Sequence, residues 1–234
     1  MVKRFYIRLG LTIAKMALFM GLWFITTAHV SIPNPIRDPG LAARGNSETI
    51  TWASLDLTAL QTFRDHLTLT GDPQQPMGLY VEGVMAYPII QQPRSNPAYV
   101  SSQPNTLTEF ALAKHYGSLG LLAHNDLAGQ SFLALQPGQD LWVVFGDGNL
   151  KRYRVATIKH YQALQPNSPY SSFINIDDKD RTVLSAAELF LHIYERPGAL
   201  ILQTCLARNG NNSWGRLFVI ALPEETTSLS IPPE

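Results

Sequence analysis

Ala199-Leu200-Ile201-Leu202-Gln203-Thr204-Cys205 is the most informative stretch of this chain, because it predicts a buried strand that ends on a thiol. Eleven residues later, Arg216 opens a second apolar stretch, residues 216–221. Far upstream, Leu121-Leu122-Ala123-His124-Asn125 ends another apolar run on a histidine. Short continuous apolar runs are typical of buried strands. The sequence therefore predicts three strands, each with a reactive polar side chain at one edge.

These three side chains are the groups that a cysteine acyl-transferase needs. A thiolate can attack a carbonyl carbon, an imidazole can move protons, and a guanidinium can stabilise the oxyanion. Cys205, His124 and Arg216 are therefore the candidate catalytic residues. A plainer interpretation stands beside this one, because a lone cysteine is more often a small buried hydrophobe than a nucleophile.

The composition excludes several other classes of protein. The chain has 234 residues, enough for one domain or two small ones, and 45% of them are hydrophobic, which is sufficient for a core. With 18 basic and 18 acidic residues the formal net charge is zero, so no basic excess indicates a nucleic-acid partner. The single cysteine cannot form an intramolecular disulfide. Neither the cysteine nor the six histidines have metal-ligand spacing, so we expect no metal site and no cofactor.

Residues 1–30 are predicted to form a cytoplasmic stub and a signal-anchor helix. The uncharged apolar run of residues 16–30 is too short to span a bilayer, but residues 9–15 extend it to about 20 residues, with Lys15 able to snorkel to the headgroups. Basic residues before a span place the N-terminus in the cytoplasm, and here they are Lys3, Arg4 and Arg8. We therefore expect a single-pass protein of the cell membrane with an extracytoplasmic domain. A cleaved signal peptide is the alternative.

The remainder is predicted to be a Pro/Gly-rich linker (31–50), a folded domain (51–222) and a polar tail (223–234). Many short strands and few helices favour a single β-barrel or sandwich. Strands are expected within 78–90 (two), 118–124, 140–145, 150–160, 200–205 and 216–222. Helical segments are expected within 52–69, 106–114, 129–135 and 184–195, and loops within 165–180 and 206–215.

Several of these segments, taken in order, resemble the sortase family of bacterial surface transpeptidases. They are residues 120–125 followed by 132–140, the hairpin 141–155, and residues 202–205 with 216–219. The resemblance covers roughly residues 77–222 and implies a mainly β fold: one closed β-barrel of the sortase type with a few short helices, preceded by the transmembrane helix. Two positions depart from the family pattern, since the family usually has Thr where Ile201 stands and Gly where Ala123 stands. Neither position supplies a reacting group.

The resemblance implies a membrane-anchored cysteine transpeptidase and endopeptidase. Cys205 would attack a peptide carbonyl in the C-terminal sorting signal of a surface protein and form a thioacyl enzyme, and His124 would protonate the leaving amine. An amine from a cell-wall precursor or a pilin lysine would then resolve the intermediate, with His124 as the base. The family places its arginine at the start of the final strand, which favours Arg216 over Arg208. The alternatives are a non-catalytic β-domain that binds a peptide or envelope polymer, and a cysteine hydrolase of the same fold.

Other residues are given supporting roles. Thr204, Trp214 and Asn125 are predicted to contact the substrate, although Thr204 could equally be an ordinary strand threonine. An acidic stretch in the loop 165–180 is similar to the loops that bind calcium in some sortases. Its members are Asp177, Asp178 and Asp180, and we expect a solvated loop there rather than a calcium site.

Overall fold

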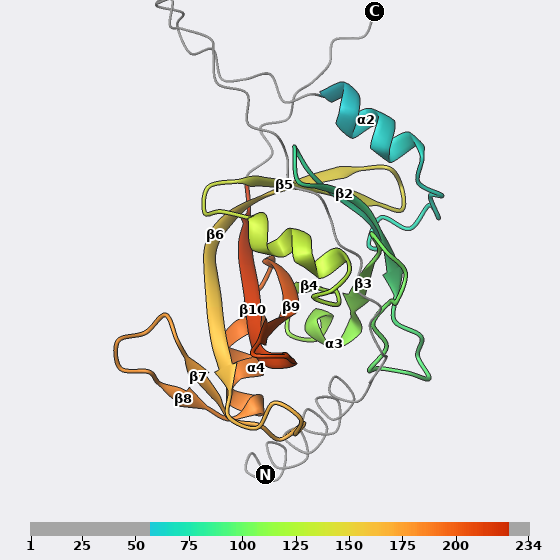
Figure 1. The fold of residues 1–234 in the computed structure, drawn as a ribbon. Coiled ribbons are helices and arrows are strands. Elements are labelled where there is room, and N and C mark those ends of the chain that lie inside the picture. The colour runs from blue at the N-terminus through green and yellow to red at the C-terminus, as the bar shows by residue number, and fades with distance from the viewer. Residues whose placement is uncertain (1–56, 225–234) are drawn as a thin grey trace, which may run out of the picture.

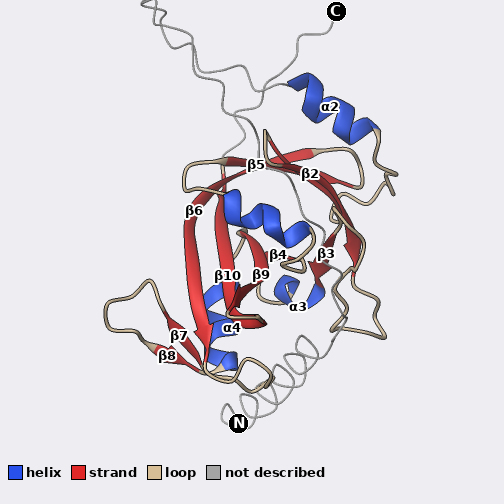
Figure 2. Cartoon of the chain, in the orientation of Figure 1, coloured by secondary structure: helices blue, strands red, loops and turns tan. Residues whose placement is uncertain are grey.

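The computed structural model describes residues 57–224, in which strands predominate over short helices (Figures 1 and 2). The strands are β1 (Pro76–Val81), β2 (Met85–Gln91), β3 (Leu107–Phe110), β4 (Leu119–Leu122), β5 (Asp140–Phe145), β6 (Leu150–Ala163), β7 (Phe173–Asn175), β8 (Val183–Leu184), β9 (Leu200–Arg208) and β10 (Asn211–Pro223). The helices are α2 (Leu57–Asp65), α3 (Ala111–Lys114), the 3₁₀ helix η2 (Ala128–Ala134) and α4 (Ala186–Tyr194).

The strands close into a barrel because β6 and β10 pair with each other. The neighbouring strands run β10-β9-β4-β3-β2-β1-β5-β6, and the additional β10–β6 pairing joins the two ends of this series. Most pairs are antiparallel, but β2 pairs with β3, and β4 with β9, in parallel. The far end of β6 also pairs with β7, and β7 with β8, so a small hairpin extends from the barrel wall (Figure 1). The predicted mainly β closed barrel is confirmed.

The interior of the barrel is filled by one face of each strand. Successive side chains of a strand point to opposite faces, and in β9 it is Leu200 and Leu202 that join the inner core. Leu217 and Val219 of β10 and residues of η2 belong to the same core. The apolar runs seen in the sequence therefore have a second apolar face, which must be covered from outside.

The helix α4 covers this outer face. Its Leu189, Phe190 and Ile193 pack with Ile201 of β9 and Phe218 of β10 in a second core outside the barrel. The helix begins at a capping box, in which the Ser185 hydroxyl accepts the Glu188 N–H and the Glu188 carboxylate accepts the Ser185 N–H. Such a box satisfies two backbone donors that a helix start otherwise leaves free. It fixes the start of α4 against the sheet.

Most predicted elements are confirmed, and three predictions are corrected. Residues 106–114, expected to be helical, first form β3, because Leu107 is buried and pairs with Ile89 of β2. The expected loop 165–180 contains β7, where Phe173 pairs with Ala163 of β6. The expected loop 206–215 is largely strand: β9 and β10 run on to the turn Asn209-Gly210, whose φ angles are +51° and +77°. Positive φ at both central residues is the signature of a tight hairpin turn.

The predicted anchor (1–30), the linker (31–50) and residues 225–234 of the predicted tail lie outside the described residues. Within 57–224, no helix combines the length and the apolar character that crossing a bilayer requires.

Candidate active site

Cys205 lies on the outer face of the barrel. Leu202 of β9 points inward and Ile201 outward, so alternation along the strand places Cys205 outward as well. Arg216 of β10 is its cross-strand partner. Directly opposed residues of an antiparallel pair share a face, with Cβ atoms about 4.5–5.5 Å apart. The thiol is half-buried, and the guanidinium-bearing residue stands beside it.

His124 reaches the other side of Cys205 through the parallel pairing of β4 with β9. Leu122 is opposite Gln203 in this pairing, and the Ala123 N–H donates to the Gln203 carbonyl at 3.2 Å. Two residues further along each strand, the same register brings His124 level with Cys205. The His124 side chain is exposed. The segment just after β4 and adjacent positions of β9 and β10 thus carry the three candidate groups, which we call the catalytic row: His124, Cys205 and Arg216.

The backbone around His124 is held by several hydrogen bonds. The His124 carbonyl accepts the N–H of Leu127 at 3.1 Å and that of Gly129 at 2.9 Å. The Thr204 hydroxyl donates to the preceding carbonyl, that of Ala123, at 2.9 Å. An exposed side chain therefore projects from a main chain that is fixed on both sides of its Cα atom.

Thr204 lies on the face opposite the catalytic row. Thr204 is 1% exposed and points inward, as Leu202 does two residues earlier. Its hydroxyl lies so close to Gly129 of η2 that a Cβ atom added there would clash with it. The prediction that Thr204 contacts the substrate does not fit this inward orientation. Its hydroxyl instead donates to the Ala123 carbonyl just beyond the end of β4.

Removing the Thr204 hydroxyl should cost stability and activity together. Thr204→Val keeps the shape but leaves the Ala123 carbonyl without its buried donor, which typically costs about 1–3 kcal/mol. Thr204→Ser keeps the donor and is expected to retain most of both properties. Urea unfolding and turnover of the two variants test this, and equal behaviour of Val and Ser would contradict it.

Gly129 is a second expected point of sensitivity. A Cβ atom at this position would lie 2.6 Å from the His124 carbonyl oxygen, so the main chain would have to move. Overpacking of this kind costs about 1–3 kcal/mol, and Gly129→Ala should also lower turnover because His124 shifts. The exposed neighbour Gln130 provides the matched control, Gln130→Ala. Wild-type unfolding and turnover in Gly129→Ala would show that the His124 backbone tolerates displacement.

The Arg216 guanidinium is held in place beneath the surface. The residue is 9% exposed, and its Nη1 donates to the carbonyls of Ser213 at 3.2 Å and Gly215 at 2.8 Å. The guanidinium carbon lies 5.8 Å from the centroid of the Phe173 ring. Donors fixed in this way stabilise a developing negative charge far better than mobile ones.

The side of the row toward the β9–β10 turn carries three further residues: Trp214, Arg208 and Asn125. The Arg208 guanidinium carbon stacks 4.9 Å from a Trp214 ring centroid. The Asn125 side-chain amide donates to the Asn212 carbonyl at 3.1 Å, linking the histidine loop to β10. Arg208 belongs to the segment 206–215 that was expected to be a loop; it lies instead at the exposed end of β9, stacked on an indole. Trp214 is half-buried and Asn125 is tied to the main chain, so both border the row.

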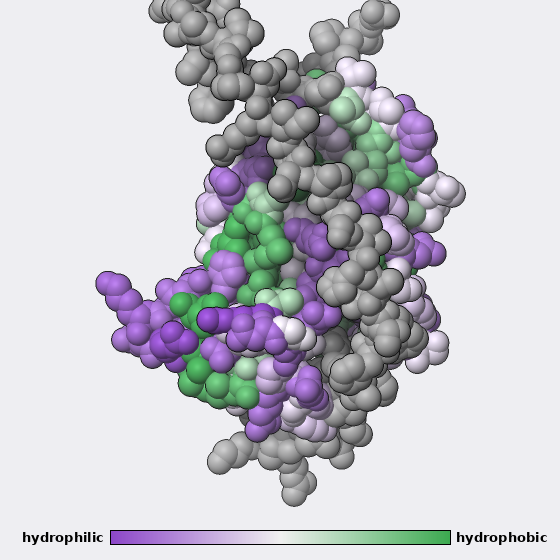
Figure 3. Space-filling model, in the orientation of Figure 1, coloured by the Kyte–Doolittle hydropathy of each residue, from purple (hydrophilic) through white to green (hydrophobic). Residues whose placement is uncertain are grey.

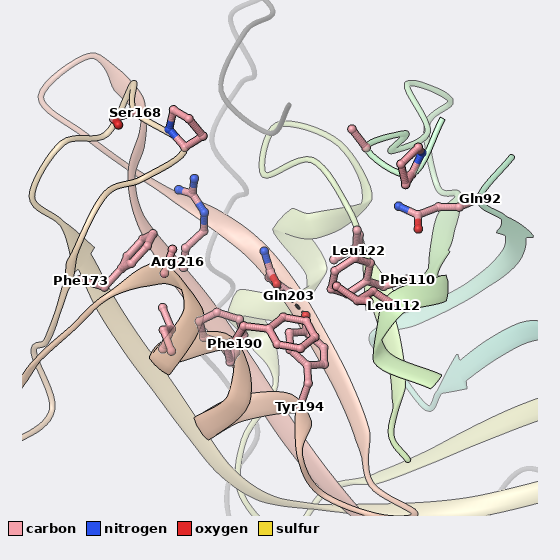
Figure 4. A pocket seen from close by; sticks show the side chains of 16 residues that line it. Gln92, Phe110, Leu112, Leu122, Ser168, Phe173, Phe190, Tyr194, Gln203 and Arg216 are labelled. Carbon is pink, nitrogen blue, oxygen red and sulfur yellow. Dashed lines mark hydrogen bonds between the residues drawn. The ribbon is translucent and has the colours of Figure 1, made fainter. Parts of the chain in front are cut away.

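An apolar cavity of about 90 Å³ adjoins the other side of the row (Figure 4). Figure 4 shows Arg216 and Phe173 on one side of it, Leu122 on the other, and Gln203 between them. Among its lining residues Arg216 is the one charged side chain; the others are Gln92, Pro97, Ala98, Phe110, Leu112, Leu122, Ser168, Pro169, Phe173, Ala186, Leu189, Phe190, Tyr194, Gln203 and Phe218. A pocket of this composition suits an uncharged segment of peptide rather than a charged one.

The side-chain carbonyl oxygen of Gln203 in this pocket accepts a hydrogen bond from α4. Tyr194 of α4 is fully buried and donates its hydroxyl to Gln203 Oε1 at 2.6 Å. Burial raises the pKa of Tyr194, so the phenol remains a neutral donor. This bond joins α4 to β9 two residues before Cys205.

The sequence did not identify the walls of this pocket. Gln203, Leu122 and Phe218 could have been found, because they alternate with core residues on strands that were predicted. Phe173 and the residues of α4 could not, because nothing local shows that the segment between β6 and β9 folds back over the outer face of the barrel.

Asp177 and Asp178 of the acidic stretch hydrogen-bond to nearby residues of β6 and of the β7–β8 hairpin. Asp177 accepts the His160 N–H at 2.6 Å and lies 3.0 Å from His160 Nδ1. The Thr182 hydroxyl donates to Asp178 and lowers the pKa of that carboxyl. Within residues 57–224, no three His, Cys, Asp or Glu side chains cluster closely enough to hold a metal ion. Figure 3 shows the hydrophilic tip of the β7–β8 hairpin projecting from the side of the molecule.

Comparisons find similar structures but no similar sequences. No protein-family model and no curated protein matches the chain. Sortase A of Corynebacterium diphtheriae is 12% identical, with a TM-score of 0.44 over 68% of this chain and 64% of that chain. Sortase A of Listeria monocytogenes is 12% identical, with a TM-score of 0.38 over 66% and 89%. Sortase E1 of Streptomyces coelicolor, solved with a tripeptide in the active site, is 16% identical, with a TM-score of 0.40 over 65% and 90%. These solved neighbours are sortases, and the values describe a likeness of fold alone.

Proposed function

We propose that this chain is a cysteine transpeptidase that cuts a peptide through a thioacyl intermediate and passes the acyl group to an amine. The observation that carries the proposal is the catalytic row: Arg216 is the strand partner of Cys205 on one side, and the β4–β9 register brings His124 level with Cys205 on the other. The mainly apolar cavity supports a peptide substrate, because it is lined by Arg216 of the row and by Gln203, two residues before the thiol.

The first half of the reaction breaks the peptide. His124 takes the proton of the Cys205 thiol, the sulfur attacks the carbonyl carbon and a C–S bond forms, while Arg216 donates hydrogen bonds to the oxyanion. The C–N bond then breaks, and His124 gives its proton to the departing amine. The product is a thioester between Cys205 and the acyl fragment.

The second half regenerates the enzyme. An incoming amine attacks the thioester carbon and gives a proton to His124. The new C–N bond forms as the C–S bond breaks, and the thiolate of Cys205 is released. We further propose that the acyl donor is a surface protein with a C-terminal sorting signal, and that the amine belongs to a cell-wall precursor or a pilin. Residues 1–30 would anchor the enzyme to the membrane, with its catalytic domain outside the cytoplasm.

Mass spectrometry of the purified full-length chain tests the proposal. After incubation with a library of sorting-signal peptides, we expect a mass increase on Cys205 that equals the N-terminal fragment of one peptide. Added amine should convert this adduct into an amide product. Release of free acid alone, in the presence of amine, would identify a hydrolase. Absence of any adduct, with intact peptide bound, would favour a binding domain.

A further inference from the structure

The geometry around Arg216 assigns a task to Phe173, which the row itself does not include. Within residues 57–224, the guanidinium makes two hydrogen bonds, and Nη1 is the donor in both. Bonds at one nitrogen fix one corner of a planar group and leave its plane free to swing about that corner. The Phe173 ring lies against the guanidinium carbon at 5.8 Å, and the negative face of an aromatic ring attracts such a cation. A cation–π contact between the guanidinium carbon and this ring opposes the swing that the hydrogen bonds leave.

The strands deliver Phe173 to this position. Phe173 of β7 pairs with Ala163 of β6. Tyr161, two residues before Ala163 on the same strand, pairs with Arg216 of β10. All of these residues therefore share the outer face of the sheet. On its other side Phe173 pairs with Leu184 of β8. The ring is 8% exposed and belongs to the outer core, so its own position is well determined.

We propose that Phe173 is a positioning residue, which holds the Arg216 guanidinium in the orientation needed for the oxyanion. This inference rests on the proposed function for its catalytic consequence, but not for its physical content. Phe173 touches no reacting atom. It acts by keeping the Arg216 donors still before the oxyanion forms, and preorganisation of this kind is the main source of electrostatic catalysis.

A substrate-independent measurement tests the positioning directly. The NMR order parameter of the Arg216 Nε–Hε vector should be near the rigid limit of about 0.85 in the wild type and fall below about 0.6 in Phe173→Leu. Phe190→Leu is the matched control, because Phe190 lines the same cavity and packs on Phe110 and Tyr194 instead. An unchanged order parameter in Phe173→Leu, or an equal fall in Phe190→Leu, would overturn the proposal.

Acylation kinetics test the catalytic consequence on the peptide that labels Cys205. Phe173→Leu should lower the acylation rate constant about tenfold with little change in KM, as loss of a desolvated cation–π contact predicts. Phe190→Leu should mainly raise KM. Phe173→Trp, which keeps an aromatic face, should restore the rate. In an Arg216→Ala background, Phe173→Leu should have no further effect on the rate; an equal loss in both backgrounds would reduce Phe173 to a lining residue.

A second variant covers the case in which Phe173→Leu does not fold. Pentafluorophenylalanine at position 173 keeps the ring and its packing but withdraws the negative charge from its face. It should lower both the order parameter and the acylation rate, and wild-type values for both would overturn the inference. If Arg216→Ala itself keeps full turnover, the oxyanion role in the proposed function fails, while the order parameter still decides whether Phe173 positions Arg216.

Discussion

Cys205→Ala is expected to abolish the thioacyl adduct and all transfer, because no other thiol exists in the chain to replace it. The change removes one sulfur atom from a half-buried position and should cost no more than about 1 kcal/mol of stability. Mass spectrometry with the peptide substrate, together with thermal unfolding, separates loss of chemistry from loss of fold. A Cys205→Ala variant that still turns over would refute the mechanism.

His124→Ala should come close to the same loss, because in the proposed mechanism the imidazole both protonates the leaving amine and accepts the proton of the incoming one. The exposed position of His124 makes this substitution structurally mild. The single thiol permits a clean control: alkylation of Cys205 counts the accessible sites in each preparation. Near-wild-type turnover in His124→Ala would transfer the proton steps to another group.

Arg216→Ala is the third substitution with a large expected effect. Loss of one well-placed oxyanion donor typically lowers turnover about 10²–10³-fold. Arg216→Lys keeps the charge but loses the planar fork and its fit against the Phe173 ring, so it should remain badly impaired. Turnover of both variants on one peptide, with unfolding midpoints as a check, measures this.

Arg208→Ala is the matched control for these variants. Its guanidinium stacks on Trp214 near the exposed end of the β9–β10 hairpin and has no place in the catalytic row. We expect a small effect, mainly on KM, because Trp214, which borders the site, loses the guanidinium that stacks on its ring. A collapse of turnover in Arg208→Ala with mild effects in Arg216→Ala would exchange the roles of the two arginines.

The local pattern predicted the parts of the fold that depend on neighbours in sequence. Apolar runs ending at His124 and Cys205 located β4 and β9, and the strands expected within 140–145 and 150–160 are the β5–β6 hairpin. The row itself was not predictable from the runs, because it depends on register between strands about 80 residues apart. The parallel pairing of Leu122 with Gln203 sets that register.

The errors arose where tertiary contacts override local preference. Residues 106–110 lack the alternation of a strand, yet β2 and β4 provide pairing partners on both sides. Phe173 looked like one apolar residue in a polar loop, and only the far end of β6 makes it part of a sheet. The role of Thr204 required knowledge of which face it occupies, since its strand carries the thiol on the other side.

The shared use of β6 has a consequence for how such a protein can diversify. Its first part closes the barrel that carries the row, and its last residues start the hairpin. One uninterrupted segment, residues 164–199, then contributes Ser168, Phe173, Leu189, Phe190 and Tyr194 to the cavity. Recombination or drift confined to that segment can remodel ligand preference while leaving the thiol, imidazole and guanidinium on an unaltered frame. Such a replacement has one constraint. The new segment must again place an aromatic ring at the position of Phe173, or Arg216 would lose the contact that is proposed to position it.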